Sequence, residues 1–181
     1  MKQYQKLAMR TSPWDGHDKI DNGVLGLMGE AGELVDVYKK WMYQSGANPP
    51  LPRAKLADEL GDVMWYLAEL ADGLNMHLID MVGKDFAELD RRAQVKVRQV
   101  KTPLRSMITG LLGRAYSLNR TVGRSDWRAV NGHVQRIMIS MSYIACIAGT
   151  TLADVAEGNI DKLKKRYPNG FDAETSMRRY E

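Results

Sequence analysis

The sequence predicts an all-α fold from its pattern and its composition. Apolar residues recur at helical spacing along most of the 181-residue chain. The amphipathic segments end at stretches rich in Gly and Pro, such as "QSGANPPLP" (44–52). The chain is also rich in Leu, Met and Ala but has only two Phe residues, a composition typical of helix packing. No segment shows a convincing strand pattern.

Helix boundaries follow from the periodicity and from local capping signals. Pro103 suits the first turn of a helix, where no backbone N–H is needed. Ser125 or Asp126 is expected to cap the next helix, and Thr150 or Thr151 the last one. The expected helices lie near residues 2–10, 19–43, 52–75, 78–97, 103–119, 126–148 and 151–166.

Charge divides the chain into an acidic and a basic part. Up to Asp90 there are nine Lys and Arg against fifteen Asp and Glu, and from Arg91 onward seventeen against seven. This split is compatible with a nucleic-acid arm, or with cations and anions that meet in one site between the halves. Few aromatic residues interrupt the basic segments, so nucleic acid is not the partner we expect.

Targeting and redox signals indicate a cytoplasmic protein without a membrane partner. No segment approaches the roughly 20 apolar residues that a membrane span requires. The first ten residues lack the apolar core of a signal peptide. Cys146 is the single cysteine and lies in the apolar run "MISMSYIACIAG" (138–149), where a buried structural thiol is expected.

Two pairs of acidic residues carry the strongest chemical signal. Glu30 and Glu33 are three residues apart in "GLMGEAGEL" (26–34), and Glu59 and Asp62 have the same spacing. Each pair therefore lies on one helical face, and the proline-rich "PPLPR" (49–53) lets the two helices fold back antiparallel. Ordinary solvated acidic faces are the alternative.

A cluster of four carboxylates needs positive charge to offset its repulsion. Hard divalent cations with oxygen ligands provide it, and Mg²⁺ bound to carboxylates and phosphates suits this chemistry. We expect Gly29 and Gly32 to let the partner helix approach closely.

An internal repeat divides the chain further. "GLMGEAGEL" (26–34) aligns with "GLLGRAYSL" (110–118), and residues 62–89 align with 136–163 in their apolar pattern. Chance similarity between amphipathic helices is the alternative to duplication. The repeat predicts a half at 1–98 with the acidic motif, a degenerate half at 99–171, and a flexible tail at 172–181.

All four acids are replaced in the second copy, whereas the packing residues persist. Arginine cannot ligate a divalent cation, so the second site is expected to be closed to metal, with an internal ion pair as one occupant. Gly110 and Gly113 are expected to keep the close helix approach. The replacements are Glu30 by Arg114, Glu33 by Ser117, Glu59 by His133 and Asp62 by Arg136.

"LGLMGEAGEL" (25–34) followed by "KLADELGDVMWYLAELADGL" (55–74) resembles the MazG-like, all-α nucleoside triphosphate pyrophosphatase family. The family signature, ExxE followed by ExxD, is met here by Glu30, Glu33, Glu59 and Asp62. "YQKLAMRT" (4–11) and "NIDKLKKRYPNGF" (159–171) are also similar to family members. The chain departs from the family in its long middle segment, which we interpret as the degenerate copy.

The resemblance implies a helical bundle that packs as dimers, with two halves of one chain imitating such a dimer. It implies Mg²⁺, with Mn²⁺ as an alternative, held by the four acids, which also act in catalysis. The implied reaction converts a nucleoside triphosphate, a dNTP or non-canonical NTP, to monophosphate and pyrophosphate. A metal-activated water is expected to attack with Glu33 as base, and a homo-oligomer is an open alternative.

Further residues are candidates for substrate contact, each weighed against an ordinary surface or core role. Position in the family's last helix selects Asn159, Lys162 and Tyr167. Lys39 and Lys55 are candidates for phosphate. Trp14, Trp41 and Trp65 are candidates for base stacking, Trp41 being our choice. The alternative function is a non-catalytic helical binding or regulatory protein that uses its acidic cleft or its basic half.

Overall fold

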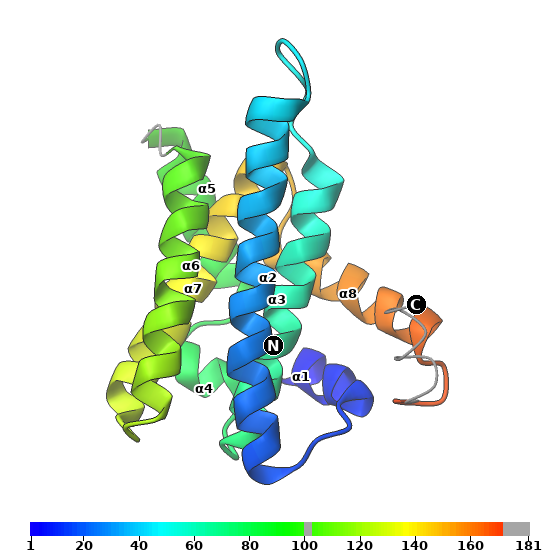
Figure 1. The fold of residues 1–181 in the computed structure, drawn as a ribbon, viewed down its shortest axis with the longest axis vertical. Coiled ribbons are helices and arrows are strands. Elements are labelled where there is room, and N and C mark those ends of the chain that lie inside the picture. Colours follow the sequence, from blue (N-terminus) through cyan, green and yellow to red (C-terminus); the bar gives the residue numbers. More distant parts are fainter. Residues whose placement is uncertain (100–102, 172–181) are drawn as a thin grey trace.

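The structure is a computed structural model that describes residues 1–99 and 103–171. Within these ranges the chain forms helices and no strand, which confirms the all-α prediction (Figure 1). The expected flexible tail at 172–181 lies outside the described residues. The elements are α1 (Lys2–Ala8), η1 (Met9–Thr11), α2 (Gly16–Gln44), α3 (Arg53–Gly73), α4 (Leu78–Val82), α5 (Phe86–Gln99), α6 (Leu104–Val122), α7 (Trp127–Ala148) and α8 (Leu152–Arg166).

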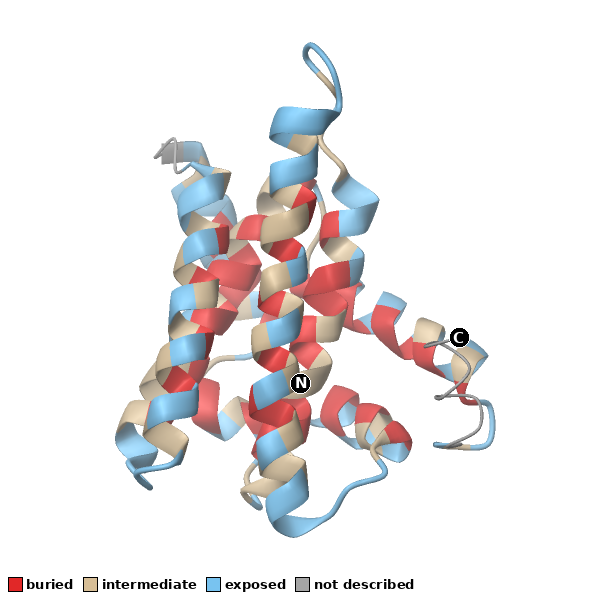
Figure 2. Ribbon diagram, in the orientation of Figure 1, coloured by how far each residue is buried: buried red, intermediate tan, exposed pale blue. Residues whose placement is uncertain are grey.

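Two helical hairpins form the body of the molecule. The α2–α3 hairpin packs against the α6–α7 hairpin, with α2 beside α6 and α3 beside α7 (Figure 1). Both hairpins contribute fully buried side chains to one hydrophobic core, among them Leu27, Leu67, Leu111 and Met141 (Figure 2). Helix α8 leaves this body and packs on α3 and α1, so the last described helix lies against the first.

The single helix expected at 78–97 is wrong in one respect. The structure divides it into α4 and α5, because Gly83 ends α4 with a left-handed backbone at φ 70°. The structure also decides which of the two candidate residues caps α7 and which caps α8. Asp126 accepts a hydrogen bond from the backbone N–H of Ala129, and Thr151 forms a capping box with Asp154.

Close packing of α2 on α3 occurs at different glycines from those expected. A Cβ at Gly26 would overlap the ring of Tyr66, and one at Gly23 would lie 2.8 Å from the backbone nitrogen of Leu70. A Cβ would meet no atom within 4 Å at the glycines that the sequence favoured, Gly29, Gly32, Gly110 and Gly113. The prediction of close approach at these four was wrong, because they lie off the faces that cross.

Helices α3 and α7 match in the register of the sequence repeat. Adding the repeat offset of 74 to the residue numbers of α3 gives 127–147, which nearly coincides with α7 at Trp127–Ala148. The same offset carries Leu78, which begins α4, onto Leu152, which begins α8. The paired positions within α3 and α7 are buried alike: Leu56 and Val130, Leu60 and Val134, Val63 and Ile137, Leu67 and Met141, and Leu70 and Ile144.

Among the described helices, none taken singly combines the length and the apolar character that crossing a membrane requires. Among the described helices, only α7 and α8 taken as a pair have the required length and apolar character, and their axes are bent by 91° relative to each other.

Candidate metal and substrate site

Three of the predicted acids converge where α2 and α3 cross. Glu30 on α2 and Glu59 and Asp62 on α3 each place a carboxylate oxygen within 4.8 Å of the others. Glu30 follows Gly26 by four residues, so it shares the helical face that approaches α3. Glu59 is only 4% exposed, whereas Glu30 and Asp62 are half-buried. We call these three residues the acid triad.

The environment of the acid triad makes negative charge unfavourable. Burial, followed by the charges of Asp62 and Glu59, raises the pKa of Glu30 from 4.5 to about 7. Near neutral pH, Glu30 in the metal-free triad is therefore protonated in only part of the molecules. A divalent cation would replace that proton, and the all-oxygen donor set fits a hard ion such as Mg²⁺.

Two predicted lysines lie at the triad. Lys55 Nζ is 2.6 Å from Glu59 Oε1, and this hydrogen bond raises the pKa of Lys55. Lys162 on α8 places its Nζ 2.7 Å from carboxylate oxygens of both Asp58 and Asp62. The two ammonium groups act as internal counter-ions, which reduces the repulsion between the carboxylates.

A buried hydrogen-bond chain orients Asp62. Tyr4 Oη on α1 donates to Asn159 Oδ1 at 2.9 Å, and Asn159 Nδ2 donates to Asp62 Oδ1 at 3.3 Å. Gly61 leaves room for this contact, because a Cβ there would lie 3.1 Å from the Asn159 side chain. Burial raises the pKa of Tyr4 well above its usual value. Asn159 was predicted, but Tyr4 was not, although it opens the "YQKLAMRT" segment.

An aromatic recess of about 280 Å³ lies beside the triad. Glu30 and Asp62 form part of its wall. Tyr167, predicted from its position in the last helix, also lines the recess and stacks on Phe171 with ring centroids 5.8 Å apart. The aromatic wall consists of Trp14, Trp65, Tyr66, Tyr167 and Phe171.

Two of the remaining predicted residues, Glu33 and Trp41, line a second groove farther along α2. Glu33 is exposed and outside the triad, and it lines this groove together with Trp41 and Lys55. Trp41 Nε1 donates to the backbone oxygen of Pro49 at 3.0 Å. Lys39 pairs with Asp36 rather than with a triad member. The structure therefore brings Trp14 and Trp65, and not Trp41, to the acids.

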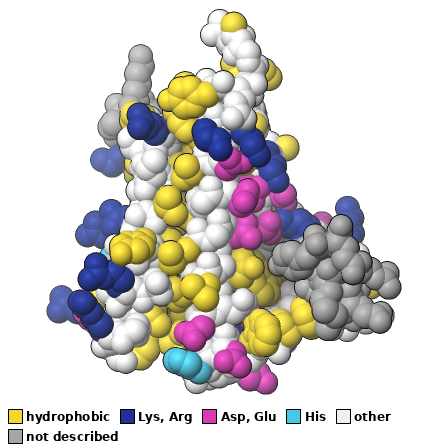
Figure 3. All heavy atoms as spheres, viewed as in Figure 1, with side chains coloured by type: hydrophobic (Ala, Val, Ile, Leu, Met, Phe, Trp, Pro, Cys, Tyr) yellow, Lys and Arg dark blue, Asp and Glu magenta, His cyan; other side chains and the backbone are white. Residues whose placement is uncertain are grey.

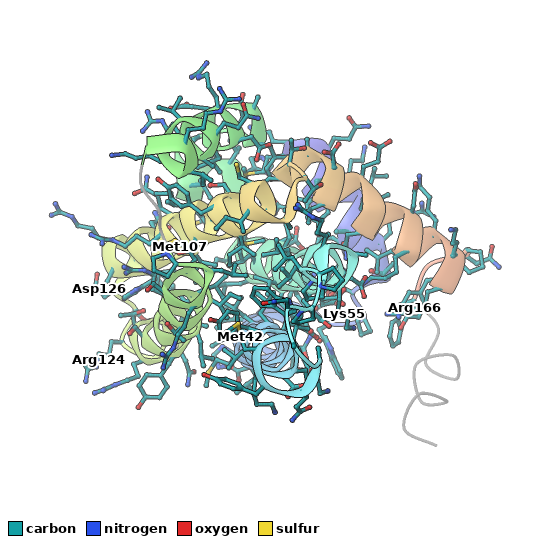
Figure 4. The ribbon with its side chains drawn as sticks, turned by 90° about the horizontal axis from the view of Figure 1, so that it is seen from above. Met42, Lys55, Met107, Arg124, Asp126 and Arg166 are labelled. Atoms are coloured by element: carbon teal, nitrogen blue, oxygen red, sulfur yellow. The ribbon has the colours of Figure 1, made fainter. Side chains whose placement is uncertain are left out.

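The site occupies one side of the molecule. Figure 3 shows acidic side chains gathered over the middle of α2 and α3, with basic side chains above them. Seen from above, Lys55 and Arg166 lie on the same side, and Arg124 and Asp126 lie on the opposite side (Figure 4). A larger cavity of about 600 Å³ between α5 and α7 shares no lining residue with the triad.

Comparison with curated proteins finds a relative in a bacteriophage. The chain is 34% identical over 96 residues to the "Gene 37 protein" of Mycobacterium phage L5, and the alignment covers 49% of this chain and 84% of the relative. The chain belongs to the family of this Gene 37 protein. The Gene 37 protein is the shorter of the two chains, since the same alignment fills more of it. No model of a known protein family matches this chain, and no solved structure matches it.

Proposed function

We propose that this member of the Gene 37 family is a Mg²⁺-dependent nucleoside triphosphate pyrophosphohydrolase of the MazG-like type. The observation that carries the proposal is the acid triad, Glu30, Glu59 and Asp62, at the wall of an aromatic recess. Carboxylates within 4.8 Å suit a divalent cation, and stacked aromatic rings suit a nucleobase. A dNTP or non-canonical NTP is the proposed substrate, with Mn²⁺ as an alternative ion.

Contacts support the roles of Asp62, Lys55 and Lys162, whereas the role of Glu33 rests on its position in the ExxE motif. A bound Mg²⁺ would lower the pKa of a water molecule and offset phosphate charge. Tyr4 and Asn159 hold Asp62 in position. Lys55 and Lys162, now paired with carboxylates, are released to bind phosphate oxygens. Glu33, exposed one turn beyond Glu30, is the proposed base that accepts the proton of the attacking water.

We also propose that the chain is a fused pseudo-dimer. The matching bounds of α3 and α7 and the matching burial along both helices support a duplication. The shorter length of the Gene 37 protein is compatible with a relative that lacks a second copy. In this interpretation only the first half keeps the metal site.

A non-catalytic helical binding or regulatory protein is the second candidate. One observation favours it: Lys55 and Lys162 themselves pair with carboxylates of the acidic cluster and so offset part of its charge. A protein that merely uses an acidic cleft or its basic half for binding needs no more than this.

Pyrophosphate release separates the two candidates. We expect the full chain to hydrolyse at least one member of a panel of NTPs and dNTPs with Mg²⁺ or Mn²⁺, and none in EDTA. Glu59→Gln and Asp62→Asn should abolish turnover while keeping the helical circular dichroism. Glu157→Gln, an exposed change on α8, is the matched control and should retain activity.

Hydrolysis in ¹⁸O-labelled water tests which phosphorus atom is attacked. The label should appear in the monophosphate, and orthophosphate as first product would reject the proposal.

A further inference from the structure

Helices α5 and α7 enclose a groove of about 600 Å³, and none of its lining residues belongs to the acid triad. The groove floor is apolar, with Leu89 and Ala93 from α5 and Ile139 and Tyr143 from α7. Val95 on α5 also lines the groove, and it is 51% exposed. The packing of α5 on α7 therefore leaves apolar surface that the described chain does not cover.

The polar side chains that reach the groove floor already have partners within the protein. Gln135 Nε2 donates to the backbone oxygen of Val82 at 2.9 Å. Ser142 Oγ donates to the backbone oxygen of Ile139 at 2.8 Å. The floor therefore favours the apolar body of a ligand over a polar one.

The rim of the groove is positively charged. Lys84, Arg91, Arg92 and Lys96 line it, and no acid lies among the described residues around it. Arg92 is neutralised by Glu88, whose Oε1 lies 2.6 Å away. The other three cations form no ion pair within the described ranges. A cleft lined by charge of one sign attracts the opposite charge, so the rim is complementary to an anion.

The size of the groove suits a small molecule better than a partner protein. Its wall on α7 runs from Gln135 to Tyr143, which is about 12 Å or two helical turns. Pockets for small ligands typically measure about 300–1,000 Å³. A stable protein interface covers about 800 Å² on each partner, which is more than two turns of two helices provide.

We propose that the groove between α5 and α7 binds a small amphiphilic carboxylate, taken up as a free molecule from solution. Its apolar chain or ring would lie on Leu89, Ile139 and Tyr143. Its carboxylate would meet the unpaired cations of the rim, where Arg91 can donate two parallel hydrogen bonds to it. The inference rests on this groove alone and not on the proposed hydrolysis.

Calorimetric titration of the full chain with monomeric sodium decanoate tests the apolar part of the groove. We expect one decanoate per chain, and an affinity that falls about twofold to fourfold for each methylene removed in octanoate and hexanoate. Ile139→Gln removes apolar surface at a half-buried position and should weaken binding about tenfold. Leu25→Gln is the matched control on α2, where the side chain is 63% exposed, and should change affinity less than about twofold.

A second pair of variants tests the charged rim. Lys84→Gln/Lys96→Gln should weaken decanoate binding about threefold to tenfold. The same variant should bind decanol, the neutral analogue, as well as the wild type does. Lys2→Gln/Lys6→Gln removes two exposed lysines from α1 and should change decanoate affinity less than about twofold. The helical circular dichroism should be the same in all four variants.

The remaining arms of the experiment identify other occupants of the groove. No binding of decanoate, or an equal loss in a groove variant and its control, would overturn the proposal. Binding to anionic phospholipid vesicles without binding of monomeric decanoate would replace it by a membrane surface. A dimer in sedimentation that Ile139→Gln dissociates, and that decanoate does not, would assign the groove to a second copy of the chain. Glu59→Gln should leave decanoate binding intact, so a failure of the proposed hydrolysis does not affect the result.

Discussion

Glu30 is the residue at which burial and charge repulsion combine most strongly. Its carboxyl group loses its proton near pH 4.5 in the unfolded chain and near pH 7 in the metal-free fold. Between these values the folded state binds more protons, so the free energy of unfolding falls as the pH rises. Because the side chain is half-exposed, we expect a fall on the order of 1 to 2 kcal/mol between pH 5 and pH 8.

Urea unfolding in EDTA at the two pH values measures this fall. Glu30→Gln should flatten the pH dependence, since it removes the titrating group. Added Mg²⁺ should raise stability at pH 8 more than at pH 5. An identical slope in wild type and variant would contradict this account of Glu30.

Under the proposed function, Lys162 would compete with Mg²⁺ for Asp62. Its Nζ contacts both Asp58 and Asp62 at 2.7 Å, so it must move before a cation binds Asp62 closely. Lys162→Met should therefore lower the stability of the metal-free protein and raise its affinity for Mg²⁺. Lys164→Met is the control, because among the described residues Lys164 pairs with exposed Asp161, at 3.2 Å, and with no acid of the triad. Calorimetric titration with Mg²⁺ checks both, and weaker binding in Lys162→Met would contradict competition.

The sequence predicted part of the site at the residue scale. Spacing on a helix fixes which residues share a face, so Glu30, Glu59 and Asp62 could be grouped in advance. The distance of a residue from the point where two helices cross is not encoded in that spacing. Trp41 lies near the end of α2, beyond the crossing, and Tyr4 reaches the site through a contact 155 residues away in the chain.

Gly26 and Gly29 on α2 allow the effect of tight helix packing on stability to be separated from the effect of helix propensity. Gly26→Ala should lower the free energy of unfolding by about 2 kcal/mol, because the added methyl group would displace the Tyr66 ring. Gly29→Ala meets open space and should raise it by up to about 1 kcal/mol, since alanine favours the helix. Urea unfolding of both variants tests the crossing. Equal effects at the two positions would show that α2 meets α3 elsewhere.

Boundaries between elements were predicted unevenly. The end of α2 and the start of α3 are marked by prolines, and the Thr151 capping box marks α8. The break between α4 and α5 was missed because apolar residues on both sides of Gly83, such as Val82 and Phe86, keep a helical period across it. Periodicity reports the buried face but does not show whether the backbone is continuous.

The whole molecule should unfold as one unit, because both hairpins share a core. Leu67 on α3 and Met141 on α7 occupy matching positions in the repeat and are both fully buried. Leu67→Ala and Met141→Ala should each lower the free energy of unfolding by about 2 to 5 kcal/mol. Both variants should keep a single transition when followed by tryptophan fluorescence and by circular dichroism. Separate transitions for the two probes would show that the halves unfold independently.

The all-α class was predictable at this scale because composition and periodicity agree along the chain. The packing of one hairpin on the other was expected only through the repeat. The position of α8 follows from side-chain contacts with α3 and α1, which no local pattern contains.

The contact of Lys162 with the acids has a consequence for synthesis on the ribosome. The chain emerges from its N-terminus, so α2 and α3 leave the exit tunnel long before α8 does. During that interval the acids lack their counter-ion from α8, and Tyr4 has no Asn159 to which it can donate. The nascent hairpin therefore presents an open carboxylate cluster to the ions of its surroundings. Under the proposed function, Mg²⁺ meets no competition from Lys162 until α8 emerges, so the ion would bind most readily before the chain is released.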